Sequence, residues 1–128
     1  MKKVAVETPI GILNGRDAIY LDEVNLREGK NTLCLQGEFN GKLASKVNSA
    51  GFIKYRMIFK RMVAMKMVEL DSWDWRKEKS ESSFDEDTES YWIKELGGKI
   101  SSGHRHFCIQ TYDQVFDVVC EDYEIEML

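Results

Sequence analysis

The stretch HRHFCIQTYDQVFDVVCE, residues 104–121, decides the fold. Two runs of mostly apolar, β-branched and aromatic residues flank a polar segment, which is the pattern of a β-hairpin. We predict the turn at Asp113-Gln114, so that Phe107 faces Cys120 and His106 faces Glu121. The apolar side chains then gather on one face, whereas a slip of one residue would mix the two faces.

Four further segments have the alternation or composition of strands. They are residues 3–7, 18–26, 32–39 and 52–70. Turn residues at 28–31 predict a hairpin between the second and third segments. The fourth segment is too long for one ordinary strand, so we expect a turn or bulge near Lys60-Arg61. A second break is expected near Glu121-Asp122, where the apolar period shifts before a final strand.

One segment has the pattern of a helix. Ser83-Phe84-Asp85-Glu86 matches a capping box, acidic residues fill the following turn, and Gly97-Gly98 ends the pattern. The sequence therefore predicts a helix over about 84–96, with Tyr91 or Trp92 largely buried against a sheet.

Together these elements predict a mostly β (α+β) fold, an antiparallel sandwich or partly closed barrel with that one helix packed on it. The 128 residues, with 43% hydrophobic and 31% charged side chains, are expected to form a single globular domain spanning 1–128.

Composition also indicates the compartment and the class of partner. No signal peptide is recognised, and nothing approaches the roughly 18 apolar residues of a membrane helix. Three cysteines in apolar stretches are typical of reduced thiols, so we expect a cytoplasmic protein. Residues 1–64 hold eleven basic and six acidic side chains, and residues 65–128 hold seven and sixteen. The acidic half argues against nucleic acid and favours a protein partner.

His104, His106 and Cys108 alternate along the predicted strand and could share one face. That spacing could hold zinc, with Glu121 as a fourth ligand, or could make His106–Glu121 an acid–base pair. The simpler interpretation is surface complementarity across a hairpin. We therefore predict no metal, no cofactor and no catalytic residue.

Two other sets of side chains invite a binding role. Lys54, Arg56, Lys60 and Lys66 form a basic stripe, which we interpret as a solvated outer face. Trp73 and Trp75 lie in a polar loop. They either fold back over the sheet or anchor a partner as a hot spot.

The sequence thus favours a small cytosolic, non-enzymatic interaction domain with an acidic surface, which neutralises or regulates another protein. In composition, though not in any motif, it is similar to toxin-neutralising immunity proteins. The alternative is a small-ligand or metal-binding barrel or sandwich, with or without enzymatic activity, centred on His104 and His106. The binding residues predicted under these hypotheses are Trp73, Trp75, His104, His106, Tyr112 and Glu121.

Overall fold

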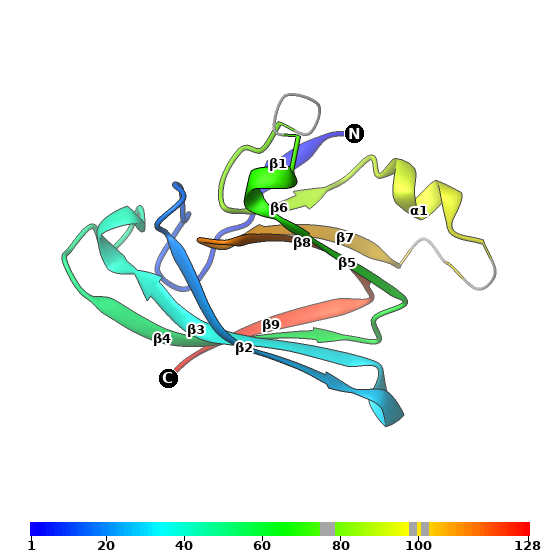
Figure 1. Ribbon diagram of the computed structural model, residues 1–128, viewed down its shortest axis with the longest axis horizontal. Coiled ribbons are helices and arrows are strands. Elements are labelled where there is room, and N and C mark those ends of the chain that lie inside the picture. Colours follow the sequence, from blue (N-terminus) through cyan, green and yellow to red (C-terminus); the bar gives the residue numbers. More distant parts are fainter. Residues whose placement is uncertain (75–78, 98–99, 101–102) are drawn as a thin grey trace.

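The computed structural model describes residues 1–74, 79–97, 100 and 103–128, and it shows two antiparallel sheets facing each other (Figure 1). The first sheet has the order β1-β6-β7-β8-β5. Its strands are β1 (Lys3–Ala5), β5 (Ala64–Glu69), β6 (Phe84–Asp87), β7 (Arg105–Gln110) and β8 (Gln114–Cys120). The second sheet has the order β2-β3-β4-β9. Its strands are β2 (Ile19–Arg27), β3 (Thr32–Asn40), β4 (Phe52–Lys60) and β9 (Asp122–Met127).

The predicted alternation along the second sheet is confirmed. Every second residue of β3 is buried, and the odd-numbered side chains of β4 enter the core. The turn η1 (Glu28–Lys30) joins β2 to β3, as the turn residues predicted. A bulge between Leu21 and Glu23 interrupts this pairing, and a Cβ on Gly37 would collide there with the carbonyl of Tyr20. Only glycine fits at this place.

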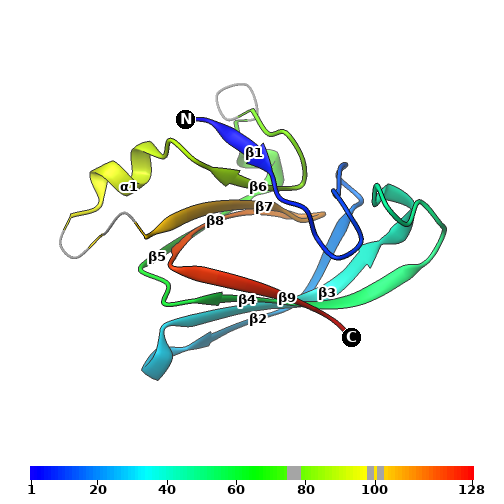
Figure 2. The same ribbon diagram turned by 180° about the vertical axis from the view of Figure 1, so that it is seen from behind.

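Aromatic rings fill the space between the sheets. Phe59 of β4 lies 5.9 Å from Phe107 of β7 and 6.4 Å from Phe84 of β6 between ring centroids. Tyr123 of β9 contacts Phe107 at 4.7 Å. Since these strands belong to different sheets, this cluster holds the sandwich together. Figure 2 shows the same arrangement from behind, with β9 and β4 beneath β7 and β8.

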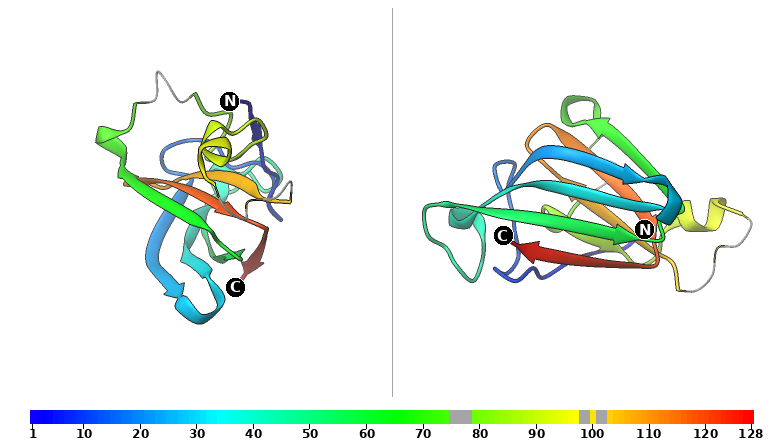
Figure 3. Two further views of the ribbon diagram at one scale, coloured as in Figure 1. Left: turned by 90° about the vertical axis from the view of Figure 1, so that its right-hand side faces the viewer. Right: turned by 90° about the horizontal axis from the view of Figure 1, so that it is seen from below.

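The chain changes sheets at the two breaks that the sequence predicted. Arg61 adopts a left-handed φ of 53° directly after β4, and β5 then pairs in the other sheet. Glu121 separates β8 from β9, which returns to β4. Figure 3 shows both crossings from the side and from below. The sheets do not join into a barrel within the described residues, so the predicted sandwich is the correct alternative.

The predicted helix bounds are wrong. Phe84–Asp87 is the strand β6, which pairs with β1 and β7, and the Ser83 hydroxyl donates to the carbonyl of Gly15 at 2.8 Å. The helix α1 spans only Tyr91–Glu95, and its N-cap is Ser90. Neither Tyr91, which is 65% exposed, nor Trp92 is largely buried. Sheet pairing with distant partners outweighs a local capping pattern here.

The predicted hairpin is confirmed, but its register is wrong by two residues. Phe107 faces Val118, and His106 faces Val119 rather than Glu121. The turn centres on Tyr112-Asp113 because the amide of Thr111 donates to the Gln114 carbonyl, and the amide of Gln114 donates to the Thr111 hydroxyl. A shift of two residues keeps each side chain on its face, so the predicted apolar set is buried together. Its members are Phe107, Ile109, Phe116, Val118 and Cys120.

Cys34, Cys108 and Cys120 are not joined in disulfide bonds. Cys108 and Cys120 are buried, and burial raises the pKa of Cys120 to about 12. Cys34 is half-buried on the outer face of β3, where partial burial also raises the pKa of its thiol. No helix in the described part of the chain has the length and apolar character needed to cross a membrane.

A thiol-labelling experiment tests this placement. We expect one equivalent of maleimide to react with the native protein, at Cys34, and three to react in urea. Since the Cys34 pKa is raised, thiolate and labelling rate should increase as the pH rises through and beyond the ordinary thiol range. Labelling of Cys120 in the native state would contradict the fold.

A pair of phenylalanine variants tests the core. Phe84→Ala should lower the free energy of unfolding in urea by about 3–5 kcal/mol, because Phe84 is fully buried in the aromatic cluster. Phe52→Ala is the matched control, since Phe52 is 59% exposed. Its cost should be about 1 kcal/mol or less. Equal costs would show that β6 does not contribute to this core.

Candidate functional site

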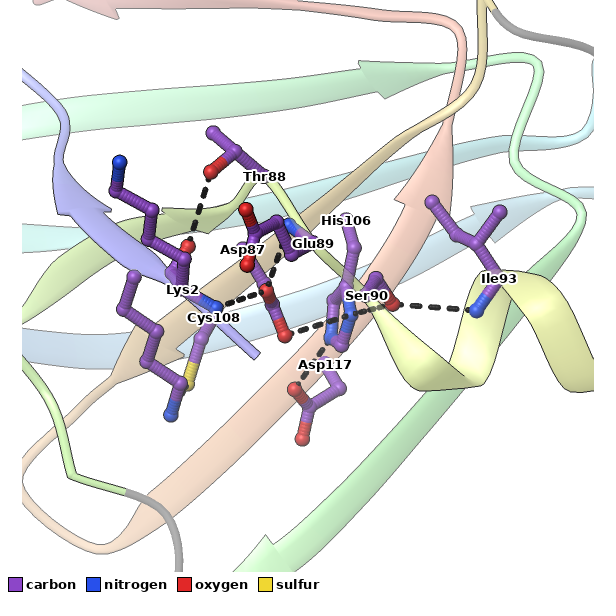
Figure 4. A network of polar contacts seen from close by, with 10 residues as sticks. Lys2, Asp87, Thr88, Glu89, Ser90, Ile93, His106, Cys108 and Asp117 are labelled. Atoms are coloured by element: carbon purple, nitrogen blue, oxygen red, sulfur yellow. Dashed lines mark hydrogen bonds and ion pairs between the residues drawn. The ribbon is translucent and has the colours of Figure 1, made fainter.

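Polar side chains gather on the outer face of the five-stranded sheet. Residues of β6, β7 and β8 that alternate with the apolar core set must point away from the core. They include Asp87, His106 and Asp117, and all three are nevertheless buried. Figure 4 shows that they converge with Ser90, which precedes α1. We call Asp87, Ser90, His106 and Asp117 the outer polar cluster.

His106 is the centre of this cluster. Its Nε2 lies 2.7 Å from Oδ1 of Asp117, and its Nδ1 lies 2.7 Å from Oγ of Ser90. Oδ2 of Asp87 is 3.9 Å from Nδ1. Asp87 is held in turn by the amides of Lys2, at 3.0 Å, and Glu89, at 3.2 Å. Both ring nitrogens therefore have partners, and the ring orientation is fixed from two sides.

The hydrogen bonds select one tautomer of His106. An ionised Asp117 can only accept, so Nε2 carries the proton that it receives. Ser90 Oγ already accepts from the amide of Ile93 at 3.1 Å. The Ser90 hydroxyl is then free to donate to an unprotonated Nδ1. Both ring nitrogens of His106 and the Ser90 hydroxyl are therefore hydrogen-bonded.

Ser90, His106 and Asp117 are linked in the order of a hydrolase triad, but their surroundings do not suit one. Ser90 is 6% exposed, and its oxygen caps α1. The carboxylate of Asp87 lies beside the same ring nitrogen, where it would oppose the negative charge of an acyl-transfer intermediate. The arrangement therefore orients His106 and does not assemble a nucleophile.

A cavity of about 210 Å³ opens beside the outer polar cluster. His106, Asp87 and Asp117 line it, and Trp92 forms one wall, with its ring 5.5 Å from the His106 ring. Lys66 Nζ lies 4.8 Å from the centre of the Trp92 ring. The cavity thus combines carboxylates, an imidazole, an aromatic face and an amine.

The predicted His106–Glu121 pair does not exist. Because of the register, Glu121 lies near His104 instead, with 4.0 Å between His104 Nε2 and the carboxylate. Glu121 also accepts a bond from Arg61 at 3.0 Å. Among the described residues no three histidine, cysteine or acidic side chains are arranged to hold a metal ion.

Tyr112 takes part in a second site, toward the other end of the β7–β8 hairpin (Figure 1). Its ring stacks on Tyr20 at 5.3 Å, and Phe52 meets Tyr20 edge-on at 5.7 Å. The guanidinium of Arg16 lies 4.7 Å from the Tyr112 ring and donates from Nε to the Tyr112 carbonyl. We call Arg16, Tyr20, Phe52 and Tyr112 the aromatic patch.

Acidic residues border the aromatic patch. Glu69, Asp71 and Asp113 line a hollow of about 240 Å³ that also includes Arg16. On the other side, burial and then the charge of Asp17 raise the pKa of Tyr20. This end of the molecule therefore presents rings and an arginine next to negative charge.

Of the two tryptophans predicted as binding residues, the structure describes only Trp73. Trp73 is half-buried, and Lys3 Nζ lies 5.4 Å from its ring. Trp73 thus folds back against the first sheet, as one of the two interpretations proposed. Trp75 lies outside the described residues.

Several acids of the acidic half, residues 65–128, are either buried or paired in the part of the chain that the structure describes. Asp85, Asp87 and Asp117 are buried. Three more acids pair with the basic half, through the ion pairs Arg56–Glu126, Lys60–Glu124 and Arg61–Glu121. The same pairs neutralise much of the predicted basic stripe, whereas Lys66 lies on the other sheet. Along β4, Arg56 and Lys60 are therefore paired with acids of β9.

Comparison of the chain with protein-family models, with curated proteins and with solved structures gives no match. Function must therefore be argued from the geometry of the two sites.

Sequence reasoning missed three of the four residues in the outer polar cluster. Asp117 carried a usable signal, because it is the one charge within the apolar run 115–120. A charge in a buried strand requires a partner, and the facing strand offered His106. Asp87 and Ser90 carried no such signal, because they lay within the predicted helix.

Ser90→Ala tests the outer polar cluster. The variant removes the cap of α1 and the donor to His106 Nδ1, so we expect a loss of about 1–3 kcal/mol in the free energy of unfolding. Glu89→Ala, one residue earlier and exposed, should change it by about 0.5 kcal/mol or less. Equal effects of the two substitutions in urea unfolding would contradict the network.

Proposed function

We propose that this chain is a non-enzymatic domain that binds another protein through the aromatic patch. The observation that carries the proposal is the exposure of Phe52 and Tyr112, at 59% and 38%, beside Arg16 on one surface. Tyrosine and arginine are enriched among residues that dominate binding energy, and phenylalanine is enriched at interfaces. A monomer gains little by leaving such rings in water.

The patch is also held in place before binding. Tyr20 stacks on Tyr112, and the Tyr20 carbonyl accepts a bond from the Tyr55 hydroxyl at 2.8 Å. Tyr55 is itself buried and stacked on Phe39 at 4.0 Å. Rings that are already ordered lose less entropy when a partner covers them, which favours affinity.

Charge indicates the kind of partner. Glu69, Asp71 and Asp113 beside the patch favour a partner with basic side chains around an apolar centre. Such acids chiefly increase the association rate and are screened by salt. The function is then the neutralisation or regulation of a basic protein. Cysteines that form no disulfide bonds favour a cytoplasmic location for that encounter.

Capture from cells of the native host tests the proposal. A tagged wild-type domain should retain a basic protein after cross-linking at low salt. Phe52→Ala and Tyr112→Ala should each reduce the recovery of that protein about tenfold or more, the effect of losing a hot-spot ring. Asp71→Asn combined with Asp113→Asn should weaken recovery and make it less sensitive to salt.

Leu26→Ala is the matched control, since Leu26 is an apolar side chain of comparable exposure, 56%, near the η1 end of β2 and away from the patch. It should leave recovery unchanged. A captured protein that binds all variants alike, or no captured protein, would contradict the proposal.

A further inference from the structure

We propose that the cavity beside His106 binds a small organic cation with N–H donors, a primary ammonium or a guanidinium group. This site lies at the α1 end of the molecule and is separate from the aromatic patch (Figure 1). Each can therefore be present without the other.

The floor of the cavity holds two buried carboxylates, Asp87 and Asp117, with which no lysine or arginine of the described residues forms an ion pair. The side chains of Asp87 and Asp117 are only 4% and 6% exposed. Their only ion-pair partner within the described residues is His106, which both approach. Two buried carboxylates thus share one imidazole, and a buried carboxylate favours a cationic neighbour.

The floor also has unused hydrogen-bonding capacity. Asp117 accepts one bond, from His106 to Oδ1, and Oδ2 has no donor among the described residues. Figure 4 shows this second oxygen directed away from His106. Asp87 uses Oδ1 for two backbone amides, while Oδ2 has only the 3.9 Å approach to His106. A carboxylate can accept about four bonds, so an ammonium or guanidinium group finds acceptors here.

The wall of the cavity suits a cation as well. Trp92 and Tyr91 line it, and tryptophan offers the most favourable ring face for a positive charge. Lys66 already demonstrates this preference, since its Nζ lies 4.8 Å from the Trp92 ring centre. In β5 Lys66 stands opposite Asp117, so the chain places its own amine at the edge of the site.

Two lysines, Lys3 and Lys66, line the same cavity. We infer that they lower the affinity for a cation but do not make the cavity a site for an anion. Lys3 Nζ lies 3.8 Å from Cys108 Sγ and 5.4 Å from the centre of the Trp73 ring. Lys66 forms no ion pair in the described part of the chain and rests on the ring that a ligand would use. A bound cation therefore displaces Lys66 from Trp92, and Lys66 acts as a competitor.

Titration of the full chain with simple probes tests the inference. Chemical shifts of the Trp92 indole N–H and the His106 ring are followed by NMR with n-butylammonium and with guanidinium, each up to about 50 mM. Both should give saturable shifts at these two residues. Butyrate and n-butanol, of similar size, should give none.

Two substitutions should act in opposite directions. Asp117→Asn keeps an oxygen that accepts from His106, and it should weaken n-butylammonium binding about tenfold. Lys66→Gln removes the competitor and should strengthen binding about threefold. Trp92→Leu provides a second loss-of-binding variant if Asp117→Asn does not fold, as judged by urea unfolding.

The same titration with an acetylated, amidated lysine peptide distinguishes the source of the cation. Binding as tight as that of n-butylammonium supports a protein side chain, and weaker binding supports a free amine. Absence of saturable shifts, equal affinity in Asp117→Asn, or weaker binding in Lys66→Gln would overturn the inference. Shifts of the same residues by Zn²⁺ but not by amines would also overturn it. The aromatic-patch variant Phe52→Ala should bind the probes normally, so this result is independent of the proposed protein partner.

Discussion

A carboxylate in the middle of an apolar strand must find a hydrogen-bond donor, and Asp117 finds it in His106. Asp117 belongs to β8, whose neighbouring side chains Phe116 and Val118 lie in the core. Its own side chain therefore points to the outer face, under the segments that cover the first sheet. His106 of β7 forms a hydrogen bond with Asp117 through Nε2, and Ser90 forms one with Nδ1 on the other side of the ring. Through Ser90 this interaction also sets where α1 begins, and with it the position of Trp92 over the cavity.

The hairpin of β7 and β8 thus has two separate tasks. Its inner face supplies Phe107 and Phe116 to the aromatic core between the sheets, and its outer face carries the buried polar residues. Its turn, centred on Tyr112-Asp113, places Tyr112 against Tyr20 of the second sheet. One hairpin in one register therefore positions both candidate sites, at opposite ends. Both faces of the hairpin are buried. A change in the register between β7 and β8 would therefore expose apolar side chains or leave a carboxylate without a donor.

Most of the strand pattern could be predicted from the sequence, since half-buried strands alternate visibly, as in β3 and β4. The breaks at Arg61 and Glu121 were also predictable, the first because residues 52–70 are too long for one ordinary strand and the second because the apolar period shifts there. The register was not, because the sorting of faces detects a slip of one residue but not of two. The register is fixed instead by the turn, where the amide of Gln114 donates to the Thr111 hydroxyl. The helix bounds were predicted wrongly for another reason. The acids at 85 and 87 resembled a charged first helical turn, while their true partners, β1 and β7, lie far away along the chain. Long-range pairing leaves little local signal.

The central claim is that His106 bridges Asp117 and Ser90 in one fixed tautomer. The most direct measurement is nitrogen-15 NMR of the His106 ring in the native protein. We predict a proton on Nε2 that exchanges slowly with solvent, because it is buried in the bond to Asp117. Nδ1 should carry no proton and should respond to the Ser90→Ala substitution. A proton on Nδ1 with Nε2 unprotonated, or a ring proton that exchanges freely, would contradict the account.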